Sequence, residues 1–213
     1  MYIITVFDQH FGVFDRKARL VSEALHSLLP NSRWVIYDNK IVYFVTYPAD
    51  SYAEEALNDG LLEYLSKNKL SAAISGRFQT LLELRQAYQQ SLAAFELGCR
   101  VNPGQTVYCY RDYLPYHIGE LLSRHAPLRS FCHPAVLRLA EYDHANQTQY
   151  LATLSSYLKY AETPHKAADE LFIHKNTLFY RIRQIKERFG LHLEDGSERM
   201  RIQLTLAFLQ LIQ

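Results

Sequence analysis

Apolar residues follow two different patterns along this chain, and the change between them divides it into two regions. Up to about residue 112, short β-branched and aromatic runs alternate with segments of helical spacing. The order strand, helix, hairpin, helix, strand, helix, strand is typical of an α+β domain with a mainly antiparallel sheet. The predicted strands are 2–7, 33–37, 41–47, 72–74 and 107–110, and the predicted helices are 16–29, 52–67 and 78–97, the last ended by Gly98.

The hairpin is the clearest local signal in this region. Asp38-Asn39-Lys40 separates two strand-like runs, and Asp and Asn tolerate the left-handed backbone that a tight hairpin turn requires. Strands 33–37 and 41–47 are therefore expected to pair directly. Both are apolar on each face, although a helix layer on one side of the sheet would cover only one face.

From Leu114 onward the spacing is helical throughout. The predicted helices are 118–124, one opened by Pro134 with His133 as its cap and ending near His144, 148–160, the pair described next, and a last helix from Ser197. The expected domains are 1–112 (α+β), 113–145 (a helical linker) and 146–213 (all-α).

Residues 163–190 carry the pattern of a helix-turn-helix. Thr163 is suited to a helix N-cap and Pro164 to the first helical position, so a short helix is predicted to about Leu171. Residues 172–174 form a tight turn, and a second helix begins near Lys175. Its apolar residues fall within roughly 60° of one another at about 100° per residue, forming a core-facing stripe. These residues are Leu178, Ile182, Ile185 and Phe189.

The opposite face of this second helix is basic, amide-bearing and aromatic. Between His174 and Arg188 there are five Lys or Arg and one Glu, a local charge of +4, whereas the whole chain carries +1. We expect Lys175 and Tyr180 to read base edges, with Asn176 and Arg183 as weaker candidates. Contacts to phosphate are expected from His174, Thr177 and Arg181. The alternative is a helical hairpin with a solvated basic face.

These residues resemble a known family. The run from Leu171 to Ile185, which contains His-Lys-Asn-Thr-Leu and Tyr-Arg, resembles the C-terminal helix-turn-helix of the PucR/CdaR group of bacterial transcriptional regulators. That domain is similar in turn to the Fis-type DNA-binding domain. The resemblance is dense over residues 142–211. Upstream, the order of elements together with 73–75 and 84–88 resembles the GGDEF-like, palm-like domain of the same family. The resemblance implies duplex DNA as partner, and a separate sensory domain commonly precedes these two domains in the family.

A palm-like domain could instead be a nucleotide cyclase, which needs two carboxylates to hold Mg²⁺ against a triphosphate. Asp8 and Asp38 occupy the corresponding places, at the end of the first strand and on the hairpin. However, the hairpin has no glycine, Asn39 replaces the second carboxylate, and Lys40 brings a positive charge. The domain is therefore expected to be catalytically degenerate. The alternative function is a nucleotide-binding or vestigial cyclase domain with a helical dimerisation tail.

The amino-acid composition indicates the class of protein and the compartment in which it acts. The chain has 213 residues, 48% of them hydrophobic, as expected for a globular core, and neither a signal peptide nor a membrane span is evident. Three cysteines without CxxC spacing and nine scattered histidines indicate neither disulfides nor a metal site. We therefore expect a cytoplasmic DNA-binding regulator that is not an enzyme and has no cofactor. The effector is unknown.

Assembly can also be predicted from the pattern. Helix-turn-helix proteins usually bind as two-fold dimers, and the last helix is apolar around nearly its whole circumference. A homodimer through the sheet domain or the last helix is expected. The alternative is a monomer in which the helices of 114–144 and the last helix cover the exposed apolar surfaces.

Overall fold

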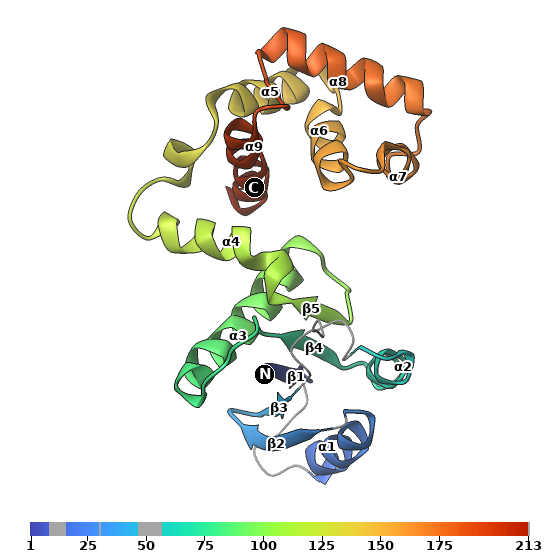
Figure 1. The fold of residues 1–213 in the computed structure, drawn as a ribbon, viewed down its shortest axis with the longest axis vertical. Helices are drawn as coiled ribbons and strands as arrows, with labels where there is room; N and C mark the ends of the chain where they lie inside the picture. The colour runs from blue at the N-terminus through green and yellow to red at the C-terminus, as the bar shows by residue number, and fades with distance from the viewer. Residues whose placement is uncertain (9–15, 30, 47–56, 213) are drawn as a thin grey trace. The chain divides into compact units, whose positions relative to one another are not determined.

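The computed structural model describes residues 1–8, 16–29, 31–46 and 57–212. These form two compact units, Met1–His117 and Ile118–Gln213 (Figure 1). Each unit has its own hydrophobic core. None of the described helices combines the length and apolar character needed to cross a bilayer.

The first unit contains a five-stranded sheet in the order β2-β3-β1-β4-β5. The strands are β1 (Tyr2–Phe7), β2 (Ser32–Tyr37), β3 (Lys40–Val45), β4 (Ser71–Ile74) and β5 (Val107–Cys109). Neighbours β2/β3, β3/β1 and β1/β4 are antiparallel, and β4/β5 is parallel. The predicted α+β class is confirmed, with one parallel pair at the edge.

Helices cover the two faces of this sheet unequally. The main core lies against α1 (Arg16–Leu28) and α2 (Asp59–Lys67), and it takes every second residue of the strands, such as Ile4 and Tyr43. On the other face, Ile3 and Val42 pack with Phe78 and with Ala87 of α3 (Leu84–Val101). A short 3₁₀ helix, η2 (Leu81–Glu83), precedes α3.

The hairpin forms as predicted, with Tyr37 opposite Lys40. Asp38 and Asn39 both have positive φ, at 48° and 55°. This is the geometry of a tight type I′ turn, which matches the twist of the two strands.

Several predicted bounds were wrong. The helix predicted over 78–97 begins only at Leu84, after the 3₁₀ helix η2, and it ends at Val101. Gly98 does not end α3 but lies inside it. A glycine suits this position because the Tyr108 ring approaches closely: an added Cβ would be 2.1 Å from the ring. The helix predicted over 52–67 begins at Asp59, where Asn58 accepts a hydrogen bond from the Leu61 N–H; its residues 52–56 lie outside the described ranges. The helix predicted at 118–124 begins at residue 110.

That helix is α4 (Tyr110–Ser123), and it contains Pro115. Contacts made by its first turns within the first unit explain the early start. The Tyr110 hydroxyl is 2.9 Å from His117 Nδ1, and the Tyr113 ring packs edge-on against Tyr108. Proline usually marks a helix boundary, so the sequence pattern favours a start after Pro115. The aromatic contacts that support the earlier start cannot be seen in the sequence.

The second unit is helical. After η3 (Leu128–Phe131) it contains α5 (Pro134–Asn146), α6 (Tyr150–Lys159), α7 (Pro164–Glu170), α8 (Lys175–Phe189) and α9 (Gly196–Ile212). Its core joins residues of all five α-helices. Helix α5 lies in the segment expected to be a linker, yet it contributes Ala135, Val136 and Leu139 to this core. His133 caps α5, as predicted, by accepting a hydrogen bond from the Ala135 N–H.

Candidate nucleic-acid interface

The ends of α7 and α8 are set by local residues. Thr163 is the N-cap residue of α7 and Pro164 its first helical residue, although the Thr163 side chain makes no capping hydrogen bond. His174 caps α8: its Nδ1 accepts from the Asn176 N–H at 3.2 Å. Gly190 ends α8 with a φ of 69°, a left-handed conformation that suits glycine. The sequence prediction of both helices is confirmed.

Backbone hydrogen bonds hold the turn between the two helices tight. The Phe172 N–H donates to the Asp169 carbonyl, and the Ile173 N–H donates to the Ala168 carbonyl at 3.0 Å. Ala167 and Ala168 are buried, so small side chains let α7 lie close to its neighbours. Helix α8 packs against α5, α6 and α7.

The apolar stripe predicted on α8 is the face that packs on these helices. Leu178 and Ile185 are completely buried, and Ile182 and Phe189 are nearly so. Arg188 extends over the Tyr142 ring, with its guanidinium carbon 4.4 Å from the ring centre, and donates to the Tyr142 hydroxyl. The two sides of α8 therefore differ as predicted.

Six of the seven predicted DNA-contacting residues are exposed. They are His174, Lys175, Asn176, Thr177, Tyr180 and Arg183. Arg181 is half-buried instead, and its Nη1 donates to the Thr153 hydroxyl of α6 at 3.4 Å. The sequence pattern did not reveal this contact, because it joins residues 28 positions apart.

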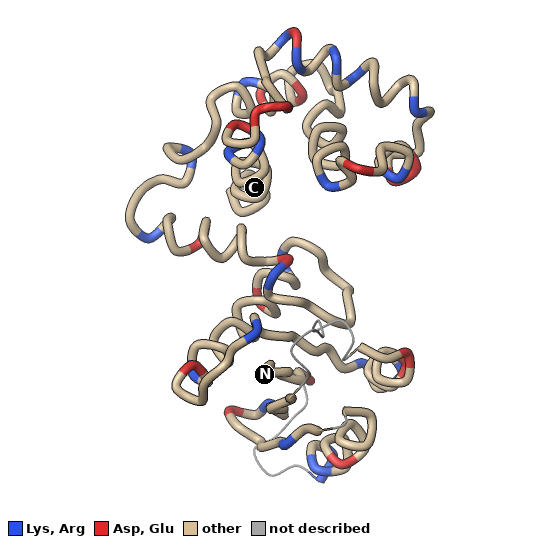
Figure 2. The backbone as a smooth tube through the Cα atoms, viewed as in Figure 1, with Lys and Arg blue, Asp and Glu red and all other residues tan. Residues whose placement is uncertain are grey.

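Lys and Arg positions follow α8 along its length (Figure 2), but some of their charge is paired. Arg183 contacts Glu187 at 2.8 Å, and Lys186 contacts Glu194 at 2.5 Å. Glu187 raises the pKa of the Arg183 guanidinium, and the Lys186 hydrogen bond lowers the pKa of Glu194. Lys175 lies over the Phe179 ring, 5.7 Å from its centre.

Helix α7 is fastened to α6 through Glu170. Its carboxylate accepts hydrogen bonds from the Ser156 hydroxyl at 2.5 Å and from the Lys159 ammonium and the Tyr160 hydroxyl. The Lys159 hydrogen bond is the main reason why the pKa of Glu170 is lowered, and the same bond raises the pKa of Lys159. This contact fixes the orientation of the short helix that precedes α8.

Phe172 is a residue of this region that the sequence pattern did not single out. It is 96% exposed and has a φ of 52° in the turn before α8. A bulky residue in this conformation is uncommon, and glycine would meet the backbone requirement with less strain. The turn itself was predictable, but no local signal marks position 172 as left-handed.

Each of the two carboxylates considered for a cyclase site forms an ion pair with a lysine. Asp8 contacts Lys17 at 2.6 Å, and Asp38 contacts Lys40 at 2.7 Å. Cys99, Cys109 and Cys132 are free thiols. Within the described residues, no group of three or more His, Cys, Asp or Glu side chains is arranged to hold a metal ion.

Comparisons with known proteins find a family match in each of the two units. Residues 150–208 match the PucR C-terminal helix-turn-helix domain, and residues 6–97 match the GGDEF-like domain. The proline-responsive transcriptional activator PutR of Bacillus subtilis is 28% identical over 64% of this chain and 34% of its own length. The purine catabolism regulatory protein of the same organism is 31% identical over 68% of this chain and 27% of its own length.

The chain thus spans about a third or less of the length of these two relatives. A solved structure, a regulator of polyketide synthase expression from Bifidobacterium adolescentis, aligns with 99% of this chain and 80% of its own. Its identity is 15% and its TM-score 0.39, and likeness at this level carries no functional information. Both curated relatives are named for regulation and not for catalysis, and the first is named as a transcriptional activator. With a GGDEF-like domain followed by a PucR-type helix-turn-helix, this chain belongs to the PucR/CdaR family of transcriptional regulators.

Proposed function

We propose that this chain binds duplex DNA through α8 and acts as a sequence-specific transcriptional regulator in the cytoplasm. The observation that carries the proposal is the division of α8 into a buried apolar stripe and an exposed face of cationic, amide and aromatic side chains. A helix with these two faces can rest on its own domain and enter the major groove. The regulatory names of the two relatives support the same function.

The exposed residues of α8 are proposed to fall into two groups, those that contact base edges and those that contact phosphates. Lys175 and Tyr180 are proposed to read base edges, because both are exposed and neither forms an ion pair or hydrogen bond with another described residue. Asn176 and Arg183 are weaker candidates, Arg183 because Glu187 already engages its guanidinium.

His174, Thr177 and Arg181 are proposed to contact phosphates. The hydrogen bond from Arg181 to Thr153 uses one of five guanidinium N–H groups and holds the side chain in one orientation. The remaining donors can meet the DNA backbone at a low cost in side-chain entropy.

The test compares two single substitutions by fluorescence anisotropy on a selected operator and on random duplexes, at several salt concentrations. Fragments bound from genomic DNA supply the operator. Arg181→Ala should weaken binding about equally on all duplexes and reduce the salt slope by about one unit, since one phosphate contact is lost. Lys175→Ala should mainly reduce preference for the operator, by about 1–3 kcal/mol.

Lys67→Ala is the matched control, because Lys67 is an exposed cation of α2 that is paired with Glu63 in the other unit. It should change neither affinity nor salt slope. Equal loss from Arg181→Ala and Lys175→Ala with an unchanged salt slope would reject the assignment of roles. Failure of the unmodified chain to bind duplex DNA with salt-dependent affinity would reject the function itself.

We further propose that the chain acts as a homodimer. One recognition helix reads only a few base pairs, whereas two related by a two-fold axis read half-sites roughly 34 Å apart. Apolar side chains remain exposed on the second unit outside α8, on α4, η3 and α9. They are Ile118, Leu121, Phe131, Met200 and Ile212. We propose that contacts between copies use this surface.

Light scattering at micromolar concentration, with and without a palindromic operator, tests the assembly. Two copies per operator are expected, and Met200→Glu should shift the free chain toward monomer. A monomer under both conditions, bound as one copy per operator, would reject the dimer.

A further inference from the structure

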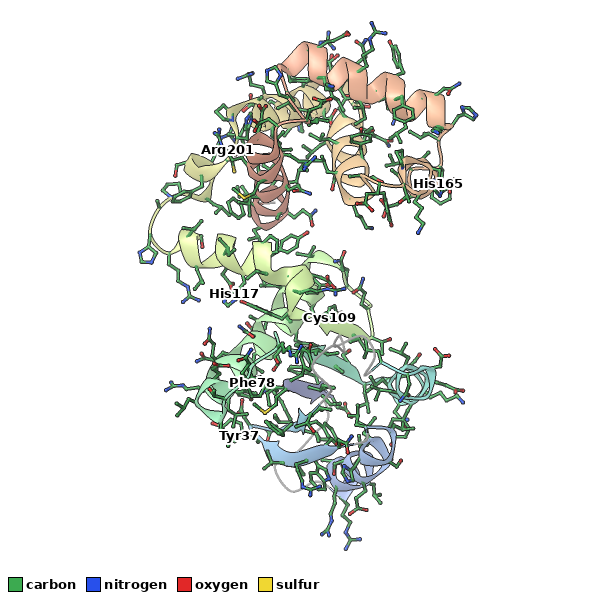
Figure 3. The ribbon with its side chains drawn as sticks, viewed as in Figure 1. Tyr37, Phe78, Cys109, His117, His165 and Arg201 are labelled. Atoms are coloured by element: carbon green, nitrogen blue, oxygen red, sulfur yellow. The ribbon has the colours of Figure 1, made fainter. Side chains whose placement is uncertain are left out.

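A groove lies on the first unit, on the sheet face that carries α3. Its volume is about 550 Å³, within the range that holds small organic ligands. Its floor is the second face of the hairpin, including Val35, Val42 and Phe44, and one wall is formed by Leu84 and Tyr88 of α3. Tyr37, labelled in Figure 3, lies on the β2 side.

The groove exposes apolar side chains that neither the sheet nor α3 covers. Val35 is 56% exposed, Tyr37 60% and Leu81 69%. Helix α3 packs chiefly against β1, β4 and β5, so it leaves the outer half of this face open at β2 and β3. A contiguous apolar surface bounded by polar groups is typical of a binding site.

Two cationic side chains line this otherwise apolar groove, Arg33 from β2 and Arg85 from α3. Within the part of the chain that the structure describes, the Arg33 guanidinium donates only to the backbone carbonyl of Ser32, at 3.4 Å. Asp38 is the carboxylate at the hairpin end of the groove, and Lys40 pairs with it at 2.7 Å. The groove therefore offers positive charge beside apolar surface, which is complementary to an amphipathic anion.

Tyr88 adds a buried hydroxyl to the groove, and this hydroxyl has no hydrogen-bond partner among the described residues. The Tyr37 ring packs edge-on against the Tyr88 ring, with ring centres 5.5 Å apart. A buried donor without an acceptor costs stability, so an acceptor that reaches it gains more than it would from water.

We propose that this groove is the effector site of the chain and that it takes a small amphipathic organic anion. The ligand would have an aromatic or branched aliphatic body on Val35 and Phe44 and an anionic group, such as a carboxylate, at Arg33 and Arg85. The role as effector site rests on the proposed DNA-binding function, whereas ligand binding itself does not.

The experiment uses the full chain and two probes that share a ring system, anilinonaphthalene sulfonate and the neutral phenylnaphthylamine. Trp34, the one tryptophan of the sequence, belongs to the strand beneath the groove, with its ring packed on the opposite face of the sheet. A probe bound in the groove should therefore quench Trp34 emission by energy transfer across the sheet. The sulfonate should bind at least about tenfold more tightly than the neutral probe, since charged hydrogen bonds add to the apolar contact. Decanoate should displace it more effectively than decanol.

Substitutions locate the site. Arg85→Gln and Arg33→Gln should each weaken sulfonate binding about tenfold and change binding of the neutral probe less than about twofold. The control is Arg19→Gln, which removes an exposed arginine of α1 outside the groove and should have no effect. Val35→Glu places a carboxylate at an exposed groove position and should abolish sulfonate binding without unfolding the sheet. Tyr88→Phe should weaken decanoate binding.

The outcomes separate this proposal from its alternatives. Equal binding of both probes, or unchanged binding after both arginine substitutions, would overturn it. If Val35→Glu turned a dimer into a monomer and probe binding rose on dilution, the groove would be an interface between two copies and the proposal would fail. DNA affinity is measured on the same variants without probe, so loss of the proposed function would be recognised independently. An anion that binds the groove but leaves operator affinity unchanged would overturn the effector role alone.

Discussion

Helix α8 and the start of α3 each pack one side on a core, but they differ in what the other side offers. The exposed side of α8 carries polar and charged residues such as Lys175 and Asn176, whereas η2 and the first residue of α3 expose Leu81, Leu82 and Leu84. Exposed polar groups at helical spacing suit a hydrated, charged partner such as DNA. Exposed apolar groups beside two arginines suit a ligand that is itself partly apolar.

The difference arises because neighbouring helices cover the two apolar surfaces to different extents. Helix α8 is narrow in its apolar stripe, and α5, α6 and α7 together bury all of it. The sheet is wider than the single helix on its second face, so α3 leaves part of β2 and β3 uncovered. Substitutions on each element should therefore have separate consequences.

The largest effect is expected from the buried stripe of α8. Leu178→Ala or Ile182→Ala should destabilise the second unit by about 2–5 kcal/mol, because each leaves a cavity in a packed core. Unfolding is followed by far-UV circular dichroism, and Trp34 emission reports on the first unit separately. An unchanged Trp34 transition would show that the substitution destabilises the second unit alone.

Tyr180→Ala is the matched control, because Tyr180 lies on the exposed side of the same helix. It should leave stability within about 0.5 kcal/mol and reduce DNA binding. A loss of stability as large as that of Leu178→Ala would mean that the two sides of α8 are not distinct.

A smaller effect is expected from Gly98→Ala in α3. The new Cβ would lie 2.1 Å from a Tyr108 ring carbon, so the ring or helix must move, at a cost of about 1–3 kcal/mol. The loss should be seen in denaturant unfolding monitored by Trp34. Gly196→Ala, where an added Cβ meets nothing within 4 Å, should not destabilise the chain.

The N-cap of α5 should make stability depend modestly on pH. Burial, chiefly, and then Arg201 (Figure 3) lower the pKa of His133, whose unprotonated Nδ1 accepts from the Ala135 N–H. Because the folded pKa is below the unfolded value near 6.5, this contribution is present above pH 6.5 and is lost as pH falls through the folded pKa. The slope should not exceed about 1.4 kcal/mol per pH unit.

His133→Asn keeps a capping acceptor but does not titrate, so it should flatten stability below pH 6.5 relative to the unmodified chain. His144→Asn serves as the control, since His144 is at the other end of the same helix. An unchanged pH slope in His133→Asn would contradict the role of this cap.

No effect is expected from Asp38→Ala on DNA binding. Asp38 is a turn residue paired with Lys40, so its loss removes one exposed ion pair of small energetic value. GTP with Mg²⁺ or Mn²⁺ should give no cyclic dinucleotide with either chain. Product formed by the unmodified chain and absent in the variant would show that the first unit is catalytic.

The sequence predicted α7, α8 and the hairpin because their signals lie within a few residues. Pro164 at a first helical position, glycine at position 190 and the spacing from Leu178 to Phe189 act through the local backbone and one face of one helix. Asp38 and Asn39 act in the same way at the hairpin turn. Family resemblance then indicated what such a pair of helices does.

Only the tertiary structure decided the features that depend on residues distant in sequence. Gly98 was expected to end a helix, but it lies inside α3, where the Tyr108 ring uses the space above it. Arg181 was expected to contact phosphate, and the sequence did not reveal that it also donates a hydrogen bond to Thr153. The groove beside Arg33 and Arg85 exists because one helix covers only part of a sheet whose strand order the sequence does not state. Local backbone preferences can be read along a chain, whereas coverage and long-range contacts depend on how whole elements pack.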